Sequence, residues 1–180
     1  IGYASAKKLA QAGAKVYLAV RRLDAGREIV KEIQAEGGKA DVVYFDAYQE
    51  ETYCSMITEV AEKECKIDIL VNNFGTTDVK EDLDVVYGST DKFFEIVNIN
   101  LKSVYIPCKT VIPIMEKNGG GSIINISSVG GKYPDVSRTA YGVSKSAINF
   151  LTKDIAVQYA HKKIRSNGIM PGFIATDASM

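Results

Sequence analysis

Short, wholly apolar segments alternate along the chain with longer segments whose apolar positions recur every three or four residues. The short segments predict buried strands, and the longer ones predict amphipathic helices. The predicted strands cover residues 15–20, 42–45, 67–71, 122–126 and 165–170. The predicted helices are one that ends near Gly13, one of about three turns that ends at Gly37-Gly38, and three over 52–63, 90–117 and 139–159.

Strands that alternate with helices pair in parallel through right-handed crossovers. The pattern therefore predicts an α/β fold, a Rossmann-type doubly wound parallel sheet with helices on both faces, as a single domain over 1–180. In such sheets a central strand precedes the first helix. Because the chain opens directly on a helix at Ile1-Gly2 and stops at Met180, we expect an internal piece of a longer protein, without the first strand and the C-terminal lid. The charged segment Asp78–Gly88 is expected to be a surface loop.

Composition narrows the classes of partner. The 22 Lys and Arg balance 22 Asp and Glu without a basic run, which argues against nucleic acid. No apolar segment approaches the roughly 20 residues of a membrane span. Cys54, Cys65 and Cys108 lack metal-ligand spacing and His161 stands alone, so no metal site is expected. The cysteines are typical of reduced thiols, which favours a cytoplasmic protein.

The candidate chemistry lies between Gly121 and Lys145. Tyr141 and Lys145 are four residues apart on a predicted helix, so they share one face. Ser128 follows a predicted strand at its carboxyl end, where open α/β sheets bind ligands. A phenol beside an ammonium, with a hydroxyl nearby, can move a proton at a carbonyl or an alcohol. Taken singly, such residues are more often a packing ring, a solvated charge and a turn serine.

Asparagine and glycine supply the next candidates. Asn73 and Gly75 follow a buried strand, and they form either an ordinary turn or a site where Asn73 fixes the backbone while Gly75 admits a flat cofactor. Asn100 falls inside a predicted helix, where asparagine is unfavourable, so it either faces solvent or serves a polar task. Asn98 is expected to be the solvated one of the two.

Two further features concern the cofactor. Gly2 opens a helix, as in a phosphate-binding turn that is preceded by a strand and more glycines. Arg21 and Arg22 follow the strand over 15–20, where an acid would bind a ribose hydroxyl and an arginine accommodates a 2′-phosphate. No acid stands there, since Asp24 comes later, and this favours NADP. The alternative is that both arginines are ordinary solvated charges.

Taken in order, these residues resemble the short-chain dehydrogenase/reductase family over all 180 residues. The matching pieces are Ile1-Gly2, Asp46, NNFG at 72–75, Asn100, Ser128 thirteen positions before Tyr141, YGVSK, and PGFIATD at 171–177. The resemblance implies a catalytic tetrad of Asn100, Ser128, Tyr141 and Lys145. It implies an NADP(H) site lined by Ile1, Gly2, Arg21, Arg22, Asp46, Ala47, Asn73, Phe74, Gly75, Tyr141, Lys145, Pro171, Gly172, Ile174 and Thr176. Phe74 departs from the family, which usually has alanine at that position.

Within the family, the strings VRRL, FDAY, NNFGT and ISSVGGKYPDVSR are similar to those of clostridial bile-acid 7α-hydroxysteroid dehydrogenases that use NADP. This implies hydride transfer between NADP(H) and the 7α-hydroxyl or 7-oxo group of a bile acid. Tyr141 would be the general acid/base, and Ser128, Tyr133 and Tyr141 would contact the substrate. The family also implies a homotetramer.

Two alternatives stay open. Other members of the family reduce 3-oxoacyl carrier-protein thioesters or oxidise other alcohols, and the tetrad alone does not separate them. A protein of a different class would be a non-catalytic NADP-binding sensor on the same fold. The complete tetrad argues against a sensor, because binding alone does not require all four side chains.

Overall fold

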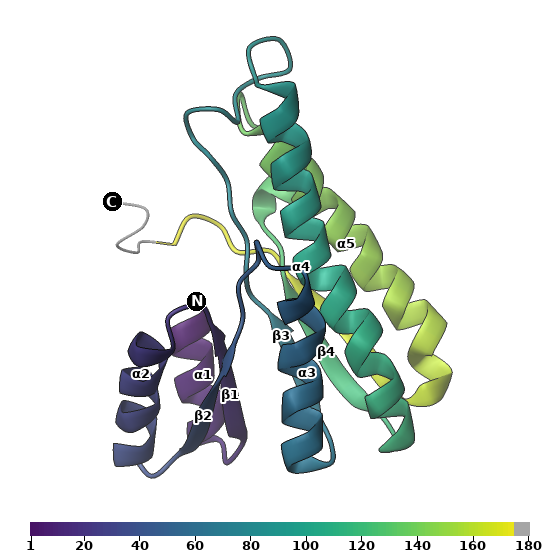
Figure 1. The fold of residues 1–180 in the computed structure, drawn as a ribbon. Helices are drawn as coiled ribbons and strands as arrows, with labels where there is room; N and C mark the ends of the chain where they lie inside the picture. Colours follow the sequence, from purple (N-terminus) through teal and green to yellow (C-terminus); the bar gives the residue numbers. More distant parts are fainter. Residues whose placement is uncertain (175–180) are drawn as a thin grey trace. The chain divides into compact units, whose positions relative to one another are not determined.

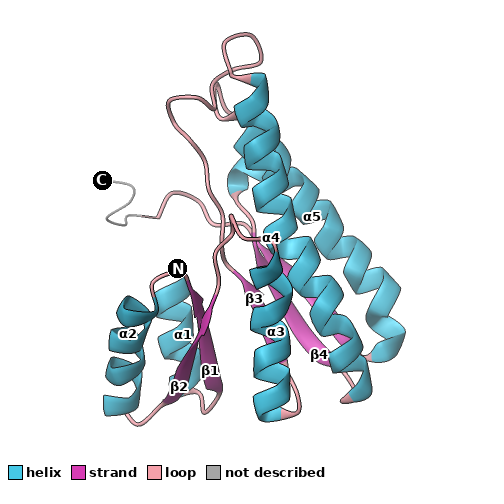
Figure 2. Ribbon diagram, in the orientation of Figure 1, coloured by secondary structure: helices cyan, strands magenta, loops and turns pink. Residues whose placement is uncertain are grey.

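Helices and strands alternate along the chain in the computed structural model, which describes residues 1–174 (Figures 1 and 2). The chain divides into two compact units, Ile1–Lys66 and Ile67–Met180. Each unit contains a parallel sheet of its own. The prediction of an α/β fold built from parallel strands is therefore confirmed.

The N-terminal unit consists of three helices and two strands. They are α1 (Gly2–Gln11), β1 (Lys15–Val20), α2 (Leu23–Ala35), β2 (Lys39–Tyr44) and α3 (Glu51–Glu64). β1 and β2 pair in parallel, from Lys15 opposite Lys39 to Val20 opposite Tyr44. β1 has the predicted bounds, whereas β2 begins three residues before the predicted start at Val42.

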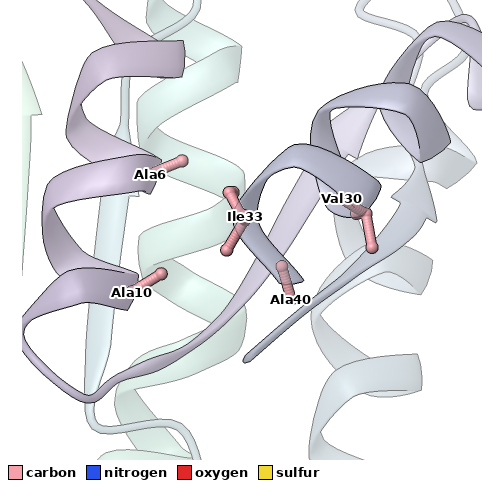
Figure 3. Close-up of a cluster of buried hydrophobic side chains, with 5 residues drawn as sticks. All are labelled: Ala6, Ala10, Val30, Ile33 and Ala40. Atoms are coloured by element: carbon pink, nitrogen blue, oxygen red, sulfur yellow. The ribbon is translucent and has the colours of Figure 1, made fainter. Parts of the chain in front are cut away.

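A small apolar cluster holds α1, α2 and β2 together (Figure 3). Ala6 and Ala10 lie one turn apart on α1, and their small side chains leave room for Ile33 of α2. Val30 and Ala40 complete the cluster. Ile33 is 2% exposed, and burial of such a side chain contributes about 2 kcal/mol. The cluster fixes α1 and α2 on the β1–β2 sheet.

The C-terminal unit has a three-stranded sheet and two long helices. Its elements are β3 (Ile69–Asn72), α4 (Thr90–Lys117), β4 (Gly121–Ile126), the 3-10 turn η1 (Val129–Gly131), α5 (Thr139–Tyr159), the 3-10 turn η2 (Ala160–Lys162) and β5 (Ile164–Ile169). β4 lies between β3 and β5, parallel to both. α4 and α5 run side by side and pack against this sheet (Figure 1). This packing brings the middle of α4 and the first turns of α5 close to the carboxyl ends of the strands.

α4 is the longest helix, and it is capped at its start by Ser89, whose Oγ accepts a hydrogen bond from the Lys92 backbone N–H at 3.3 Å. Pro107 and Pro113 lie inside α4 without ending it. Within residues 1–174, none of the helices combines the length and the apolar character that crossing a membrane requires.

Candidate active site

Tyr141 and Lys145 lie one turn apart near the start of α5, as the sequence predicted. Lys145 is 3% exposed, and its Nζ donates a hydrogen bond to the Ile126 carbonyl oxygen, 2.9 Å away at the end of β4. The same Nζ lies 5.6 Å from the centroid of the Tyr141 ring. Burial lowers the pKa of Lys145 from its ordinary 10.5 to about 8, because a buried ammonium loses hydration. A largely dehydrated ammonium therefore faces the phenol.

Ser128 stands between β4 and η1. Its Oγ accepts a hydrogen bond from the Gly130 backbone N–H at 3.1 Å. A Cβ placed on Gly130 would lie 3.5 Å from the Ser128 Oγ and 3.9 Å from the Tyr141 Cε1. The serine hydroxyl and the phenol ring therefore border the same point, and glycine leaves that point open.

The turn after Ser128 packs directly on the backbone of α5. A Cβ on Gly131 would lie 2.6 Å from the Lys145 carbonyl carbon and 2.8 Å from the Ser146 nitrogen, so only glycine permits this approach. Asn149 Nδ2 donates a hydrogen bond to the Gly131 carbonyl oxygen at 3.1 Å. These contacts hold the serine segment against the turn of α5 that ends at Lys145.

Asn100 is fully buried in the middle of α4. Its Oδ1 accepts from the Thr76 backbone N–H at 2.8 Å, and its Nδ2 donates to the Thr76 carbonyl at 2.8 Å and to Ser144 Oγ at 3.0 Å. Of the two interpretations that the sequence left open, the structure selects the polar one for Asn100, and Asn98 is exposed as expected. The amide thus links the segment after β3 to both α4 and α5.

Gly75 lies where this segment meets Lys145. A Cβ on Gly75 would stand 2.8 Å from the Lys145 Nζ and 3.9 Å from the Asn100 Oδ1. The structure therefore gathers the four predicted tetrad residues in one region of the C-terminal unit, through a chain of close contacts at Gly75, Gly130 and Gly131.

Asn72, the last residue of β3, and the neighbouring Asn73 have different surroundings. Asn72 is buried, and its Nδ2 donates to Asn125 Oδ1 at 2.9 Å and to Cys108 Sγ at 3.3 Å. Asn73, which was expected to fix the backbone, is exposed, and its side chain makes no hydrogen bond within residues 1–174. Phe74 is half-buried and Gly75 is exposed. Asn72 therefore fixes the end of β3 against its neighbours, and the exposed Asn73 amide is accessible to a ligand.

Several positioning residues escaped the sequence analysis. Ser127 Oγ donates to the Lys145 carbonyl at 3.0 Å, and Asn125 Nδ2 donates to Thr152 Oγ1 at 2.9 Å. These bonds tie the end of β4 and the residue after it to α5. Asp82, in the segment predicted as a surface loop, is buried and contacts the start of α5. The local sequence does not mark Ser127 or Asn125 as positioning residues. Ser127 stands beside another serine, and Asn125 lies in a mostly apolar strand.

The remaining candidates of this unit are less closely packed. The Pro171 carbonyl accepts from the Val129 N–H at 3.0 Å, while Gly172 and Ile174 are exposed. Tyr133 is 60% exposed, and Lys132 Nζ lies 5.0 Å from its ring centroid. Thr176 lies outside the described residues.

In the N-terminal unit, the predicted cofactor residues stand at the ends of elements. Ile1 and Gly2 open α1, and the side chain of Ile1 provides no cap. Arg21 and Arg22 follow β1, both exposed and without an acidic partner within residues 1–174. The nearest acid downstream, Asp24, pairs with Arg27 at 2.9 Å. Two adjacent guanidinium groups therefore remain uncompensated at the end of β1.

Asp46 and Ala47 follow β2 in a tightly bonded turn. Asp46 Oδ1 accepts from the Tyr48 N–H at 3.0 Å, and the Asp46 N–H donates to Thr52 Oγ1 at 3.2 Å. The Ala47 carbonyl accepts from the Tyr53 hydroxyl at 2.7 Å. These bonds fix the backbone of the turn that the sequence assigned to cofactor binding.

Comparison with known proteins adds to this geometry. The family model described as short chain dehydrogenase matches residues 1–180. Two relatives are 7α-hydroxysteroid dehydrogenases: that of Clostridium sardiniense is 55% identical over all of this chain and 69% of its own length, and that of Paraclostridium sordellii is 56% identical over all of this chain and 67% of its own.

Among solved structures, a gluconate 5-dehydrogenase from Burkholderia cenocepacia, in complex with NADP and tartrate, matches with a TM-score of 0.87. It is 29% identical, over 96% of this chain and 66% of that one. This chain thus spans about two thirds of the length of the proteins it resembles. The likeness confirms the Rossmann-type class predicted from the alternating strands and helices.

Proposed function

This chain belongs to the short-chain dehydrogenase family, and from that premise we propose that it transfers hydride between NADP(H) and the 7α-hydroxyl or 7-oxo group of a bile acid. One observation carries the proposal: Ser128 and Tyr141 border the same open point at Gly130, and the Lys145 Nζ lies 5.6 Å from the Tyr141 ring centroid. The two clostridial relatives, both 7α-hydroxysteroid dehydrogenases, support the steroid substrate.

Tyr141 is the general acid/base in this proposal. In oxidation, its phenolate oxygen takes the proton of the substrate hydroxyl while the hydride leaves the same carbon, and in reduction the phenol protonates the forming alkoxide. The Lys145 ammonium, 5.6 Å from the ring centroid, would stabilise by its charge the negative charge on the oxygens that exchange the proton in the transition state. NADP⁺, when bound, would supply the hydride acceptor, and the protein would supply position and electrostatic field.

The other tetrad members orient the reactants. The Ser128 hydroxyl donates a hydrogen bond to the substrate oxygen, and its position beside Tyr141 suits that role. Lys145 also holds the nicotinamide ribose. Asn100 keeps a water molecule in a proton relay from Lys145, while its amide bonds to Thr76 and Ser144 steady the surroundings of that relay.

The residues present fit NADP. Arg21 and Arg22 are exposed and uncompensated, as binding of a 2′-phosphate requires, because an arginine already paired with an acid would have to give up that partner. Gly2, Asp46 and Ala47 would serve the adenosine and pyrophosphate groups. Asn73, Phe74, Gly75, Pro171, Gly172, Ile174 and Thr176 would serve the nicotinamide half.

A steroid-by-cofactor activity panel on the complete gene product tests the proposal. The substrates are a bile acid with a 7α-hydroxyl, its 7β epimer as the matched control, a bile acid without a 7-hydroxyl, and a 3-oxoacyl thioester, each with NADP(H) and NAD(H). We expect turnover of the 7α-hydroxyl with NADP⁺ alone. Turnover of the thioester alone would move the substrate class to fatty-acid synthesis. NADPH binding without turnover of any substrate would indicate a sensor.

We extend the proposal to the assembly and the location of the protein. Both units are taken as parts of one NADP-binding domain that forms a homotetramer in the cytoplasm. Large exposed side chains on α4 and α5, Phe94, Tyr105 and Phe150, support association through these helices. Light scattering of the purified protein measures the number of subunits, and a monomer would contradict the tetramer.

A further inference from the structure

The start of α5 lacks a local cap. The first four backbone N–H groups of any helix have no partner inside the helix, and a side chain at the N-cap commonly satisfies one of them. Here the N-cap residue is Arg138, whose side chain makes no capping bond and whose φ of 60° places it in the left-handed region. The helix that carries Tyr141 and Lys145 must therefore find its first partners elsewhere.

Those partners come from two consecutive residues far earlier in the chain. Four successive backbone N–H groups at the start of α5 donate to them: Arg138 to the Asp82 carbonyl at 3.0 Å, Thr139 to the Leu83 carbonyl at 3.2 Å, Ala140 to Asp82 Oδ1 at 2.8 Å and Tyr141 to Asp82 Oδ2 at 3.0 Å. Thr139 adds a bond from its hydroxyl to the Leu83 carbonyl at 2.9 Å. Both carboxylate oxygens of Asp82 are thus engaged with the helix start.

The carboxylate of Asp82 is buried and fixed in the orientation that accepts from the start of α5. Asp82 is 4% exposed, and Thr77 Oγ1 donates to its Oδ2 at 3.0 Å. No basic side chain pairs with it among the residues that the structure describes. Burial of a lone carboxylate is costly unless hydrogen bonds and a favourable field compensate. Its compensation here is the two helix amides, the Thr77 hydroxyl and the positive end of the helix dipole.

We propose that Asp82 is a positioning residue for the proton transfer by Tyr141. The inference rests on the proposed function, because it gives Tyr141 the acid/base role. Asp82 Oδ2 binds the backbone nitrogen of Tyr141 itself, so it sets where the phenol stands relative to Ser128 across Gly130. A shift of about 1 Å in a reacting group can cost about a hundredfold in rate.

The test variant is Asp82→Asn in the complete gene product. It keeps the shape of the side chain but replaces one acceptor oxygen with an NH₂ group, which cannot accept from a backbone N–H. We expect kcat for the 7α-hydroxysteroid to fall by about 10- to 100-fold, while the KM for NADP⁺ stays within about twofold. Amide hydrogen exchange in residues 138–142 should rise in the same variant.

Asp84→Asn is the matched control. Asp84 is exposed in the same segment, and its Oδ1 accepts from the Val86 and Tyr87 N–H groups at 2.9 and 2.8 Å. Within residues 1–174 it makes no hydrogen bond to α5. Its kcat should equal that of the wild type. An unchanged kcat in Asp82→Asn, or the same fall in both variants, would overturn the inference. A lower melting temperature alone would mean that Asp82 is only a cap, which also overturns it.

Tyr141→Phe, measured in parallel, separates this inference from the proposed function. If Tyr141→Phe keeps its activity, the proposed function fails. If Tyr141→Phe is inactive and Asp82→Asn is fully active, only the role of Asp82 fails. Should Asp82→Asn not fold, Thr77→Val decides, since it removes only the hydroxyl that orients Oδ2. A fall of a few-fold in kcat with faster exchange in 138–142 supports the role, and no change in either overturns it.

Discussion

The two groups of proposed site residues are held in opposite ways. In the N-terminal unit, Arg21 and Arg22 are exposed and have no acidic partner among the described residues. In the C-terminal unit, Asn100 and Lys145 are buried, and their polar atoms bond to neighbouring backbone and side chains. A charge that recognises a phosphate must stay uncompensated until the ligand arrives, whereas groups that guide a proton must be preorganised. Changes in the first region should therefore alter binding, and changes in the second should alter turnover or stability.

Tyr141→Phe is the strongest challenge to this division. It removes only the hydroxyl that transfers the proton, so kcat should fall by about a thousandfold or more while NADPH affinity stays nearly unchanged. Steady-state kinetics and a fluorescence titration with NADPH measure the two effects. Tyr159→Phe, the same chemical change near the end of α5, is the control. Residual activity above a few per cent of the wild type would refute the acid/base role.

Arg21→Ala probes the other region. Loss of one charge-assisted bond to a phosphate corresponds to a factor of about ten to a hundred in affinity, so NADPH binding should weaken by that amount and NADH binding by less than about threefold. The measurement is the dissociation constants of NADPH and NADH for the variant and for the wild type. Arg27→Ala serves as the control, because Arg27 already pairs with Asp24. Equal losses for the two cofactors would rule out the phosphate role.

Lys145→Met tests whether preorganisation weakens the fold. Burial lowers the pKa of Lys145 from 10.5 to about 8, so below pH 8 the folded protein carries the full cost of a buried ammonium. At about 1.4 kcal/mol per pH unit this cost is about 3 kcal/mol. The bond to the Ile126 carbonyl returns about 1 kcal/mol, so the variant should be more stable at pH 7 by about 2 kcal/mol, though inactive.

The sign of the pH dependence follows from the same shift. Between about pH 8 and pH 10.5 the folded protein binds fewer protons at Lys145 than the unfolded chain, so wild-type stability rises relative to the variant, and the difference fades towards pH 10.5. Urea unfolding of both proteins at pH 7 and pH 10 measures it. Lys153→Met, an exposed site on α5, should show no such trend. A variant less stable than the wild type at pH 7 would contradict the prediction.

Most of the fold could be predicted from the sequence, because buried parallel strands are apolar on both faces. The predicted bounds of β1, α4 and α5 agree with the structure. The start of β2 was missed because Lys39 and Asp41 alternate with Ala40 there, and the strand forms by backbone pairing with β1, which needs no apolar side chain. The pattern of apolar positions predicts which side chains are buried. It does not predict backbone hydrogen bonding between strands where the side chains are polar.

The residues of the candidate site could be predicted only where they are close in sequence or belong to a known sequence motif. The spacing of Tyr141 and Lys145 indicates a shared helix face, and the structure keeps it. Nothing local distinguished Asn72 from Asn73. Only their positions, one at the end of β3 and the other directly after it, separate the buried asparagine from the exposed one. Asp82 was out of reach because its partners lie 58 and 59 positions away.

The distant cap of α5 has a consequence for the order of folding. Most of α5 can form from local hydrogen bonds, but its first turn, which carries Tyr141, is completed by Asp82, 58 positions before Ala140. Closing so long a loop is slow compared with helix growth. The turn that carries the phenol therefore depends on contacts far apart in sequence although it belongs to a helix. We expect it to become rigid only when the segment around Asp82 docks. Chains that have folded their helices but not this segment already have secondary structure, and they lack an assembled active site.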